Sequence, residues 1–235
     1  MIIGGIVAAI LLIDQIIKVY IKSNFLPDET VSVFGNWFQL RYVENQGMAF
    51  GTTFGGSGWA KLGLSIFRLI AIFGIAYYWY KQAERGAKRE LLLAIGLVFA
   101  GATGNLIDSM FYDFVFPYNP CEPYNWLDGS GVYECLSDPT QATRRTGFLF
   151  GNVVDMFQFN GVWPEWVPWL GGSSMFPAIW NFADTSITVG ILMILFRQKS
   201  YYKKDPAKRV IKFEKPTDEK PDFPNEEVPV DSKLD

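Results

Sequence analysis

The segment WNFADTSITVGILMILF, from Trp180 to Phe196, is apolar enough to lie in a lipid bilayer, yet it contains Asn181 and Asp184 near its start. An ionisable side chain at membrane depth costs a few kcal/mol or more. We therefore expect these two residues to have a function that offsets the cost. Their partners must lie elsewhere in the chain.

Apolar residues make up 49% of the 235 residues, and charged residues only 19%. They cluster in four segments that reach or approach the roughly 20 residues a helix needs to cross a bilayer. These segments are Met1 to Tyr20, Leu62 to Tyr80, Leu91 to Met110 and Phe176 to Phe196. The helices of a soluble bundle, which is the alternative, normally carry a polar stripe that these segments mostly lack. The composition predicts an all-α integral membrane protein with four transmembrane helices.

The distribution of charge predicts the orientation. The loop KQAERGAKRE (residues 81–90) and the start of the tail, RQKSYYKKDPAKR (residues 197–209), are rich in Lys and Arg, which favours the cytoplasmic side. Both termini are then cytoplasmic, and residues 21–61 and 111–175 face outward. Residues 198–235 mix Lys, Glu, Asp and Pro with few large apolar side chains, which is typical of disorder. We expect a membrane domain that ends at residue 197.

The outward regions are expected to carry a small sheet and a polar insertion. Residues 31–43 alternate in a β-rich pattern, which predicts an extracytoplasmic sheet within about residues 28–55. The turn-rich stretch at about residues 112–148 looks like an insertion and contains Cys121 and Cys135. In an oxidising compartment these two cysteines would form a disulfide, and two free thiols are the alternative.

The third apolar segment repeats the polar spacing of the fourth. Asn105 and Asp108 are three residues apart, as Asn181 and Asp184 are, so each pair would share one face of a helix. Gly101 nearby would let another helix approach closely. A structural role is the alternative for the asparagines, which would then tie helices together through hydrogen bonds.

Three more charged residues lie in or near the apolar segments. Asp14 and Lys18 are at positions i and i+4, and the simplest interpretation is an ion pair that lowers the cost of insertion. Asp155 lies in an aromatic stretch that we expect to return to the outer face of the membrane, and neither it nor Asp184 has an obvious cation partner in the sequence. Two such carboxylates, brought together, would share one proton, as in an aspartic protease.

Elimination leaves the carboxylates as the strongest acid–base candidates. The chain has no histidine, which excludes Ser-His and Cys-His nucleophiles and His-ligated metal sites. Its two cysteines form no metal-ligand pattern, and no phosphate-binding loop is present. We expect carboxylate chemistry without a metal or other cofactor. A small proton-coupled transporter is the rival from another class, although its usual duplicated halves are not seen in this sequence.

Five motifs, in order along the chain, resemble those of the bacterial lipoprotein signal peptidases, membrane aspartyl proteases that cut signal peptides from prolipoproteins. They are DQIIK (14–18), ENQGMAFG (44–51), GATGNLID (101–108), NVVDMF (152–157) and FPAIWNFAD (176–184). Each motif alone is weakly specific, and the five in order make the resemblance specific.

The resemblance implies four transmembrane helices in the bacterial inner membrane, a small β-cradle on the outer face and a short periplasmic helix. It implies that Asp155 and Asp184 are the catalytic pair and that cleavage occurs just before a cysteine carrying diacylglycerol. The positions that match supporting or substrate-binding residues are Asp14, Lys18, Asn45, Gly47, Asn105, Asp108 and Asn181. The expected partners are diacylglyceryl-prolipoproteins and membrane lipids, with no nucleic acid, and we expect a monomer.

Three departures from the family pattern affect what the resemblance implies. Ser109 stands where the family usually has arginine, Trp180 stands where phenylalanine is common, and the link between the third and fourth motifs is lengthened by the insertion. The candidates to supply the missing positive charge are Arg68, Arg144 and Arg145. The loss of the arginine also leaves a non-catalytic scaffold of the same fold as an alternative.

Overall fold

The computed structural model describes residues 2–26, 28–45, 58–116 and 146–201. Its helices are α1 (Ile2–Asn24), α2 (Gly58–Glu84), α3 (Arg89–Val115) and α4 (Phe182–Tyr201). Each of the four predicted apolar segments therefore contains a helix. The fourth helix begins six residues later than the apolar pattern suggests, because residues 179–180 belong to a strand instead.

Three of the described helices are long and apolar enough to cross a membrane: α1, α2 from Trp59 onward, and α3. Helix α4 is not among them. It has 20 residues and carries Asp184, Arg197 and Lys199. The prediction of a membrane protein built from long apolar helices is confirmed, whereas a fourth crossing needs a separate argument.

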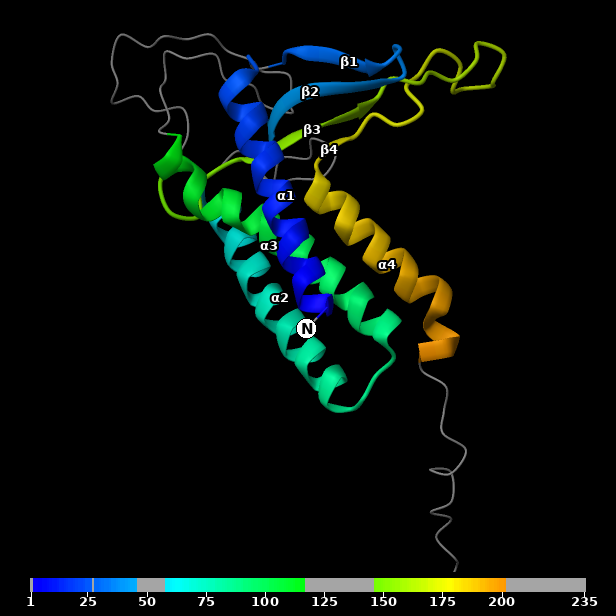
Figure 1. Cartoon of the computed structure of the whole chain (residues 1–235). Coiled ribbons are helices and arrows are strands. Elements are labelled where there is room, and N and C mark those ends of the chain that lie inside the picture. Colours follow the sequence, from blue (N-terminus) through cyan, green and yellow to red (C-terminus); the bar gives the residue numbers. More distant parts are fainter. Residues whose placement is uncertain (1, 27, 46–57, 117–145, 202–235) are drawn as a thin grey trace, which may run out of the picture. The chain divides into compact units, whose positions relative to one another are not determined.

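A four-stranded antiparallel sheet lies at one end of the helices, beside the last turns of α1 and the first turn of α4 (Figure 1). Its strands, in spatial order, are β1 (Thr30–Phe34), β2 (Phe38–Asn45), β3 (Val153–Phe159) and β4 (Ile179–Trp180). The β-rich pattern predicted the first two strands. The other two come from the far end of the sequence and enlarge the sheet.

The resemblance implied a short periplasmic helix without giving its place. The described residues form no such helix, and residues 46–57 of the first outward region lie outside them. Between α3 and α4, the aromatic stretch with Asp155 is strand β3, where the run VVDMFQF pairs with β2 and Asp155 lies in the middle. Residues 160–178 form turns there, tied by hydrogen bonds such as that from Trp163 N to Ser173 O at 2.9 Å.

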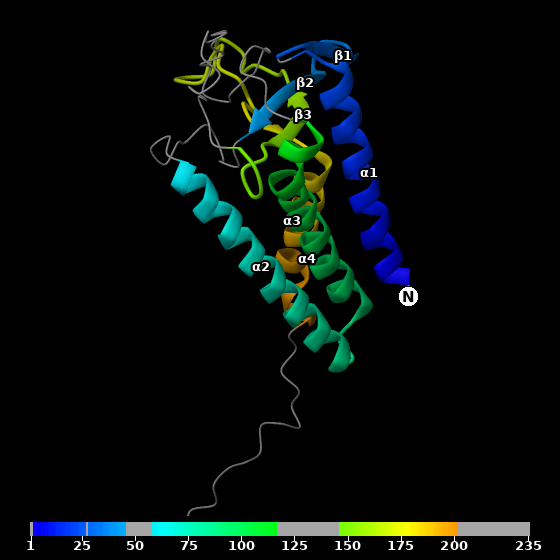
Figure 2. The same cartoon turned by 90° about the vertical axis from the view of Figure 1, so that its left-hand side faces the viewer.

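Helix α3 contacts the other three helices and lies between α1 and α2 in Figure 2. Small residues allow this close packing. A Cβ atom added to Gly101 would stand 2.2 Å from the backbone oxygen of Ala183 in α4, and one added to Gly190 would stand 2.6 Å from the oxygen of Ala94. The expectation that Gly101 permits close helix approach is therefore confirmed.

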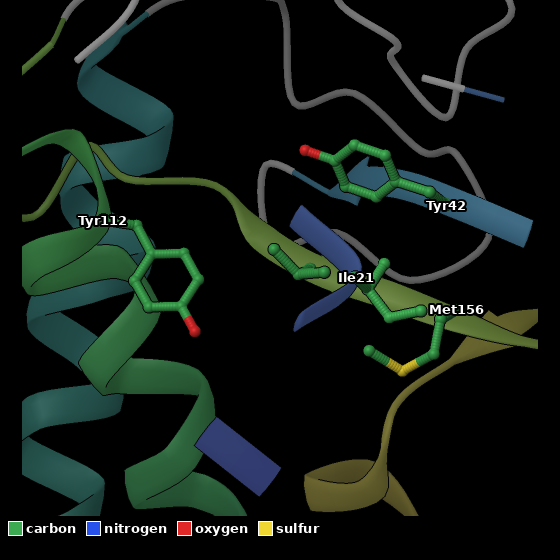
Figure 3. Close-up of a cluster of buried hydrophobic side chains, with 5 residues drawn as sticks. Ile21, Tyr42, Tyr112 and Met156 are labelled. Atoms are coloured by element: carbon green, nitrogen blue, oxygen red, sulfur yellow. The ribbon is translucent and has the colours of Figure 1, made fainter. Parts of the chain in front are cut away.

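A hydrophobic cluster joins the sheet to the helices. It consists of Ile21 from α1, Tyr112 from α3, and three residues of the sheet, Tyr42, Val154 and Met156 (Figure 3). All five side chains are buried. Because the cluster draws on α1, α3 and two strands, it holds β2 and β3 against the end of the helices and so positions the residues carried by those strands.

A row of aromatic side chains crosses the sheet. The rings of Trp37 and Phe159 stack at 5.8 Å between centroids, and those of Phe38 and Phe157 at 5.9 Å. Trp180, at the end of β4, continues the row 5.0 Å from Phe159. Phe34 of β1 joins the row through Phe38, at 6.1 Å between ring centroids. Such pairs add stability beyond their burial, so the row connects all four strands beside the start of α4.

Candidate active site

The start of α4 is a capping box formed by Asn181 and Asp184. Asn181 is the N-cap residue: its Oδ1 accepts a hydrogen bond from Asp184 N at 2.9 Å, and Asn181 N donates to Asp184 Oδ2 at 3.4 Å. This reciprocal pattern satisfies two backbone donors that a helix start leaves open. Asp184 therefore lies in the first turn of α4, which begins at Phe182.

Asp155 projects from β3 and is 1% exposed. Its Oδ1 accepts a hydrogen bond from Asn181 Nδ2 at 2.7 Å, and its Oδ2 accepts one from Asn45 Nδ2 at 3.0 Å. Burial, followed by the nearby negative charge of Asp184, raises the pKa of Asp155 to about 8. The predicted meeting of the VVD and NFAD motifs therefore occurs, and Asn181 touches both acids.

A second asparagine bridges to Asp184 from α3. Asn105 Nδ2 donates to Asp184 Oδ1 at 2.7 Å, while Asn105 Oδ1 accepts from Asn181 Nδ2 at 3.0 Å and from Lys18 Nζ at 2.8 Å. Each amide thus has a fixed orientation, because its oxygen faces donors and its nitrogen faces a carboxylate. The arrangement holds the two carboxylates through directed hydrogen bonds.

Lys18 of α1 is fully buried and lies between two further acids. Its Nζ is 3.0 Å from Asp14 Oδ2 and 2.8 Å from Asp108 Oδ2. The predicted ion pair is present, and it extends to the helix α3 acid. Asp14 has another contact as well: its Oδ1 accepts from Ala183 N at 2.8 Å. Asp14 therefore also caps the start of α4, where a negative charge is favourable.

Electrostatic interactions link the acids to α2. The charges of Asp184, Asp155 and Asp108 act on the guanidinium of Arg68. Ser109, in contrast, is buried and donates its hydroxyl to Asn105 O in its own helix at 3.3 Å. Of the three arginines that the sequence suggested, Arg68 is thus close enough to influence the acids, while residues 144 and 145 lie outside the described part of the chain.

Eight of the predicted site residues converge in the structure: Asp14, Lys18, Asn45, Asn105, Asp108, Asp155, Asn181 and Asp184. Gly47 and the pair Cys121 and Cys135 lie outside the described residues. Within those residues, no group of three His, Cys, Asp or Glu side chains is arranged to hold a metal ion.

Sequence reasoning missed Gln15. Its Nε2 donates to Asp14 Oδ2 at 3.1 Å and to Asp108 Oδ1 at 3.0 Å, while its Oε1 accepts from Tyr112 Oη at 3.2 Å. Its place directly after Asp14 in the DQIIK motif was the available indication. It also assigned no role to the buried residues Glu44, Lys61 and Asn152 or to the half-buried Lys22, although Glu44 and Asn152 begin two of the five motifs.

Helices that can cross a membrane, together with a buried pair of carboxylates held by asparagine amides, define a membrane protein with an acid pair suited to proton transfer. Comparison with known proteins identifies the family. Residues 6–198 match the family described as signal peptidase (SPase) II, and the chain belongs to this family.

The chain is similar to curated relatives over most of its length. It is 34% identical to the lipoprotein signal peptidase of Porphyromonas gingivalis (strain ATCC 33277) over 203 residues, covering 83% of this chain and 81% of the relative. It is 31% identical to the lipoprotein signal peptidase of Amoebophilus asiaticus over 207 residues, covering 83% of this chain and 77% of the relative.

Solved structures support the fold. A bacterial membrane enzyme determined by the in meso method at 2.3 Å resolution matches with a TM-score of 0.53 and 22% identity, covering 87% of this chain and 92% of that one. A second, at 1.9 Å, matches with a TM-score of 0.53 and 21% identity, covering 83% and 91%. The arrangement of helices and sheet is therefore one that a membrane enzyme adopts.

Proposed function

We propose that the chain is a membrane aspartyl endopeptidase in which Asp155 and Asp184 are the catalytic pair. Membership of the signal peptidase II family gives the reaction class, the removal of signal peptides from prolipoproteins. The substrate is a prolipoprotein modified with diacylglycerol, and cleavage occurs just before the lipidated cysteine. The observation that carries the assignment of residues is the contact of Asn181 with both acids, one from a strand and one from a helix.

The protonation of the pair suggests a role for each acid. Because burial and the charge of Asp184 raise the pKa of Asp155 to about 8, Asp155 is protonated at neutral pH. Asp184 then acts as the general base and takes a proton from a water molecule lodged between the acids. The water oxygen attacks the scissile carbonyl while Asp155 donates its proton to the carbonyl oxygen. Asp184 then gives the proton that it took from water to the leaving amine, and Asp155 takes a proton back from a hydroxyl of the tetrahedral intermediate as the C–N bond breaks, which restores the starting state of the pair. No covalent intermediate and no cofactor enter this scheme.

The surrounding polar residues support the base. Lys18 donates to the oxygen of Asn105, which polarises the amide that donates to Asp184. Asp14 and Asp108 flank the Lys18 ammonium, so its positive charge is held in place. Asn45 holds Asp155 from β2, and with Gly47 it is a candidate contact for the peptide of the substrate.

We place the protein in the bacterial inner membrane with both termini in the cytoplasm and the acid pair toward the periplasmic face. The end of α4 supports a fourth crossing: Arg197 pairs with Glu90 at 2.9 Å and Lys88 Nζ donates to Ser200 Oγ at 2.7 Å, so α4 ends beside the start of α3. Its first turn meets Asn105, further along α3. Helix α4 therefore runs along the same depth as α3, a helix long and apolar enough to span.

This placement has consequences for the substrate. The sheet acts as a cradle for the peptide on the outer face, and the lipidated cysteine enters sideways from the bilayer with its acyl chains between helices. We expect the active form to be a monomer, because one chain can supply both acids of the pair and their hydrogen-bond donors.

The test is cleavage of a diacylglyceryl-modified prolipoprotein in detergent or lipid, followed by gel mobility. Asp155→Asn and Asp184→Asn should each lower the rate by about 10²- to 10⁴-fold, the usual contribution of a general acid or base. Asp28→Asn is the matched control, because Asp28 forms an exposed ion pair with Arg41 at 3.0 Å on β2. All variants are first checked for folding.

Two outcomes would contradict the proposal. If the wild-type protein cleaves none of several lipidated substrates, the non-catalytic scaffold is favoured. If either Asn variant keeps full activity, the pairing of Asp155 with Asp184 is wrong, and Asp108 is the next acid to substitute.

A further inference from the structure

A second buried polar cluster lies beside the acid pair and takes no part in the proposed reaction. Glu44, on β2, is 7% exposed. Its Oε1 accepts hydrogen bonds from Lys22 Nζ and, at 2.7 Å, from Tyr42 Oη; its Oε2 accepts one from Asn152 Nδ2 at 2.8 Å. Asn152 Oδ1 in turn accepts from Lys61 Nζ. We call Lys22, Glu44, Asn152 and Lys61 the Glu44–Asn152 clamp.

The clamp joins four parts of the fold: α1, β2, the residue that precedes β3, and α2. Burial by itself raises the pKa of Glu44, but the charge of Lys22 and the hydrogen bonds from Lys22, Tyr42 and Asn152 together hold that pKa below its ordinary value. Glu44 is therefore ionised at neutral pH. Removing one partner from such a buried carboxylate is costly, because the charge is then left without compensation. The clamp therefore strongly favours one arrangement of its four residues.

The register in which β2 pairs with β3 changes along the two strands. Near the start of β2, Phe38 pairs with Phe159 and Leu40 with Phe157. After an irregularity between Leu40 and Val43, the register has moved by one residue, and Val43 pairs with Asp155. If the first register continued, Tyr42 would stand opposite Asp155 instead.

One residue of register decides which face of the sheet carries Asp155. Side chains alternate between faces along a strand, so a slip of one residue moves a whole strand to the other face. In the observed register Asp155 shares a face with Val43 and with Asn45, its hydrogen-bond donor. In the continued register it would share a face with Tyr42 and Glu44, away from Asn45.

We propose that the Glu44–Asn152 clamp locks β2 and β3 in the shifted register and thereby holds Asp155 on the face that carries Asn45. Glu44 and Asn152 are then positioning residues for the acid pair. Their hydrogen bond connects the two strands directly within this shifted part, and Lys22 and Lys61 anchor its two ends to helices. The catalytic consequence rests on the proposed function, but the register itself can be measured without cleavage.

The kinetic experiment uses Glu44→Gln and Asn152→Ala in the full chain. Each variant should lower kcat by about 10- to 100-fold with little change in KM, because molecules in the continued register carry Asp155 on the wrong face and lose a general acid that contributes about 10²- to 10⁴-fold. The control is Glu90→Gln, which removes an exposed ion pair of the same type, with Arg197 at 2.9 Å, and should leave kcat unchanged.

The register experiment is a disulfide test in a chain in which Cys121 and Cys135 are replaced by serine. Val43→Cys and Val154→Cys lie on opposite faces in the shifted register and directly opposite each other in the continued one, where a disulfide can form. The cross-link should be absent with the clamp intact and should appear when Glu44→Gln or Asn152→Ala is added. Ser32→Cys with Gln39→Cys is the positive control for oxidation, because the two residues are directly paired, Ser32 is exposed and Gln39 is half-buried.

Each result decides the proposal. A cross-link that appears together with a lower kcat supports it. Absence of the cross-link in both clamp variants overturns it, whether kcat falls or not, since the register would then not depend on the clamp. If Glu44→Gln fails to fold, Asn152→Ala decides alone, because it leaves the contacts of Glu44 with Lys22 and Tyr42 intact. If the wild-type protein proves inactive, the cross-link still tests the register.

Discussion

Asp155 is held by two asparagine amides, and yet the pKa of its carboxyl is raised above the ordinary value of an aspartate. The amides of Asn45 and Asn181 favour the ionised form, but burial and the neighbouring charge of Asp184 act more strongly and raise the pKa to about 8. An acid of this kind can donate a proton under physiological conditions. Its proton also makes folding depend on pH.

The sign of that dependence follows from linkage. An unfolded aspartate has a pKa of about 4, so between that pH and about 8 the folded protein holds a proton that the unfolded chain releases. Asp155 should therefore lower stability as pH rises through this window. Asp155→Asn removes the effect, and its melting temperature in detergent should exceed that of the wild type at pH about 8.5 but not at pH about 4.5. An equal difference at both pH values would contradict the raised pKa.

Arg68 is the second side chain with a testable charge effect. Three acids, Asp184, Asp155 and Asp108, act on its guanidinium, and a nearby cation makes it easier for an acid pair to reach its singly ionised form. Arg68→Gln should move the low-pH limb of the activity profile to higher pH by about one unit and lower activity below that limb about tenfold. Arg68→Lys should retain the wild-type profile.

The control for Arg68 is Lys81, an exposed cation on the same helix. Lys81 pairs with Glu84 near the end of α2 at 2.8 Å, and both side chains are exposed. Lys81→Gln should leave the pH profile unchanged. If the pH profile of Arg68→Gln is also unchanged, Arg68 is not the cation that favours ionisation of the acid pair.

The start of α4 depends on the close approach of α3. The backbone oxygen of Ala183 lies where a Cβ atom on Gly101 would stand, 2.2 Å away, and Gly104 faces Asp14 and Ala183 in the same way. Because the obstacle at Gly101 is backbone, it cannot move aside by changing rotamer. Spacing between these two helices therefore sets the position of Asp184.

Gly101→Ala should push the first turn of α4 away from α3. We expect the free energy of unfolding to fall by about 1–3 kcal/mol, which is typical of an overpacked core. The cleavage rate should fall further than the decrease in the fraction of folded protein explains. The matched control is Gly74→Ala in α2, where nothing lies within 4 Å of an added Cβ. There a better helix former should leave stability equal or slightly higher. Thermal unfolding of the purified proteins, with the cleavage rate of each, distinguishes the two.

The strands show where prediction from local sequence ends. The alternating residues 31–43 correctly indicated β-strands, since that pattern is local, and these residues form β1 and most of β2. The later run VVDMFQF is apolar on both faces and looked like a segment returning to the membrane. It becomes β3 because β2 offers it a partner and because its residues pack on Ile21 and Tyr112. No local pattern contains that information.

The proposed orientation of the whole chain makes a further prediction. With Cys121 and Cys135 replaced by serine, a cysteine at Glu165, in the exposed turns between β3 and β4, should react with a membrane-impermeant maleimide added from the periplasmic side. One at Ala87, between α2 and α3, should react only after the membrane is opened. A cysteine at Ser200, beside Lys88, should behave like Ala87 if α4 crosses the membrane. Labelling of Ser200→Cys from the periplasmic side would contradict the fourth crossing.

The amino-acid sequence by itself determined that this is a protein of apolar helices and that its chemistry rests on acids. Hydropathy and the absence of histidine are properties of composition and spacing, which need no knowledge of contacts. The motifs also named eight residues that converge. Only the tertiary structure decided how they meet: Asn181 as a helix cap touching both acids, Asp155 on a strand, and Asp14 at the start of α4. The physical reason is that strand register, helix spacing and hydrogen-bond partners are set by residues far apart in the chain, as Glu44 and Asn152 are.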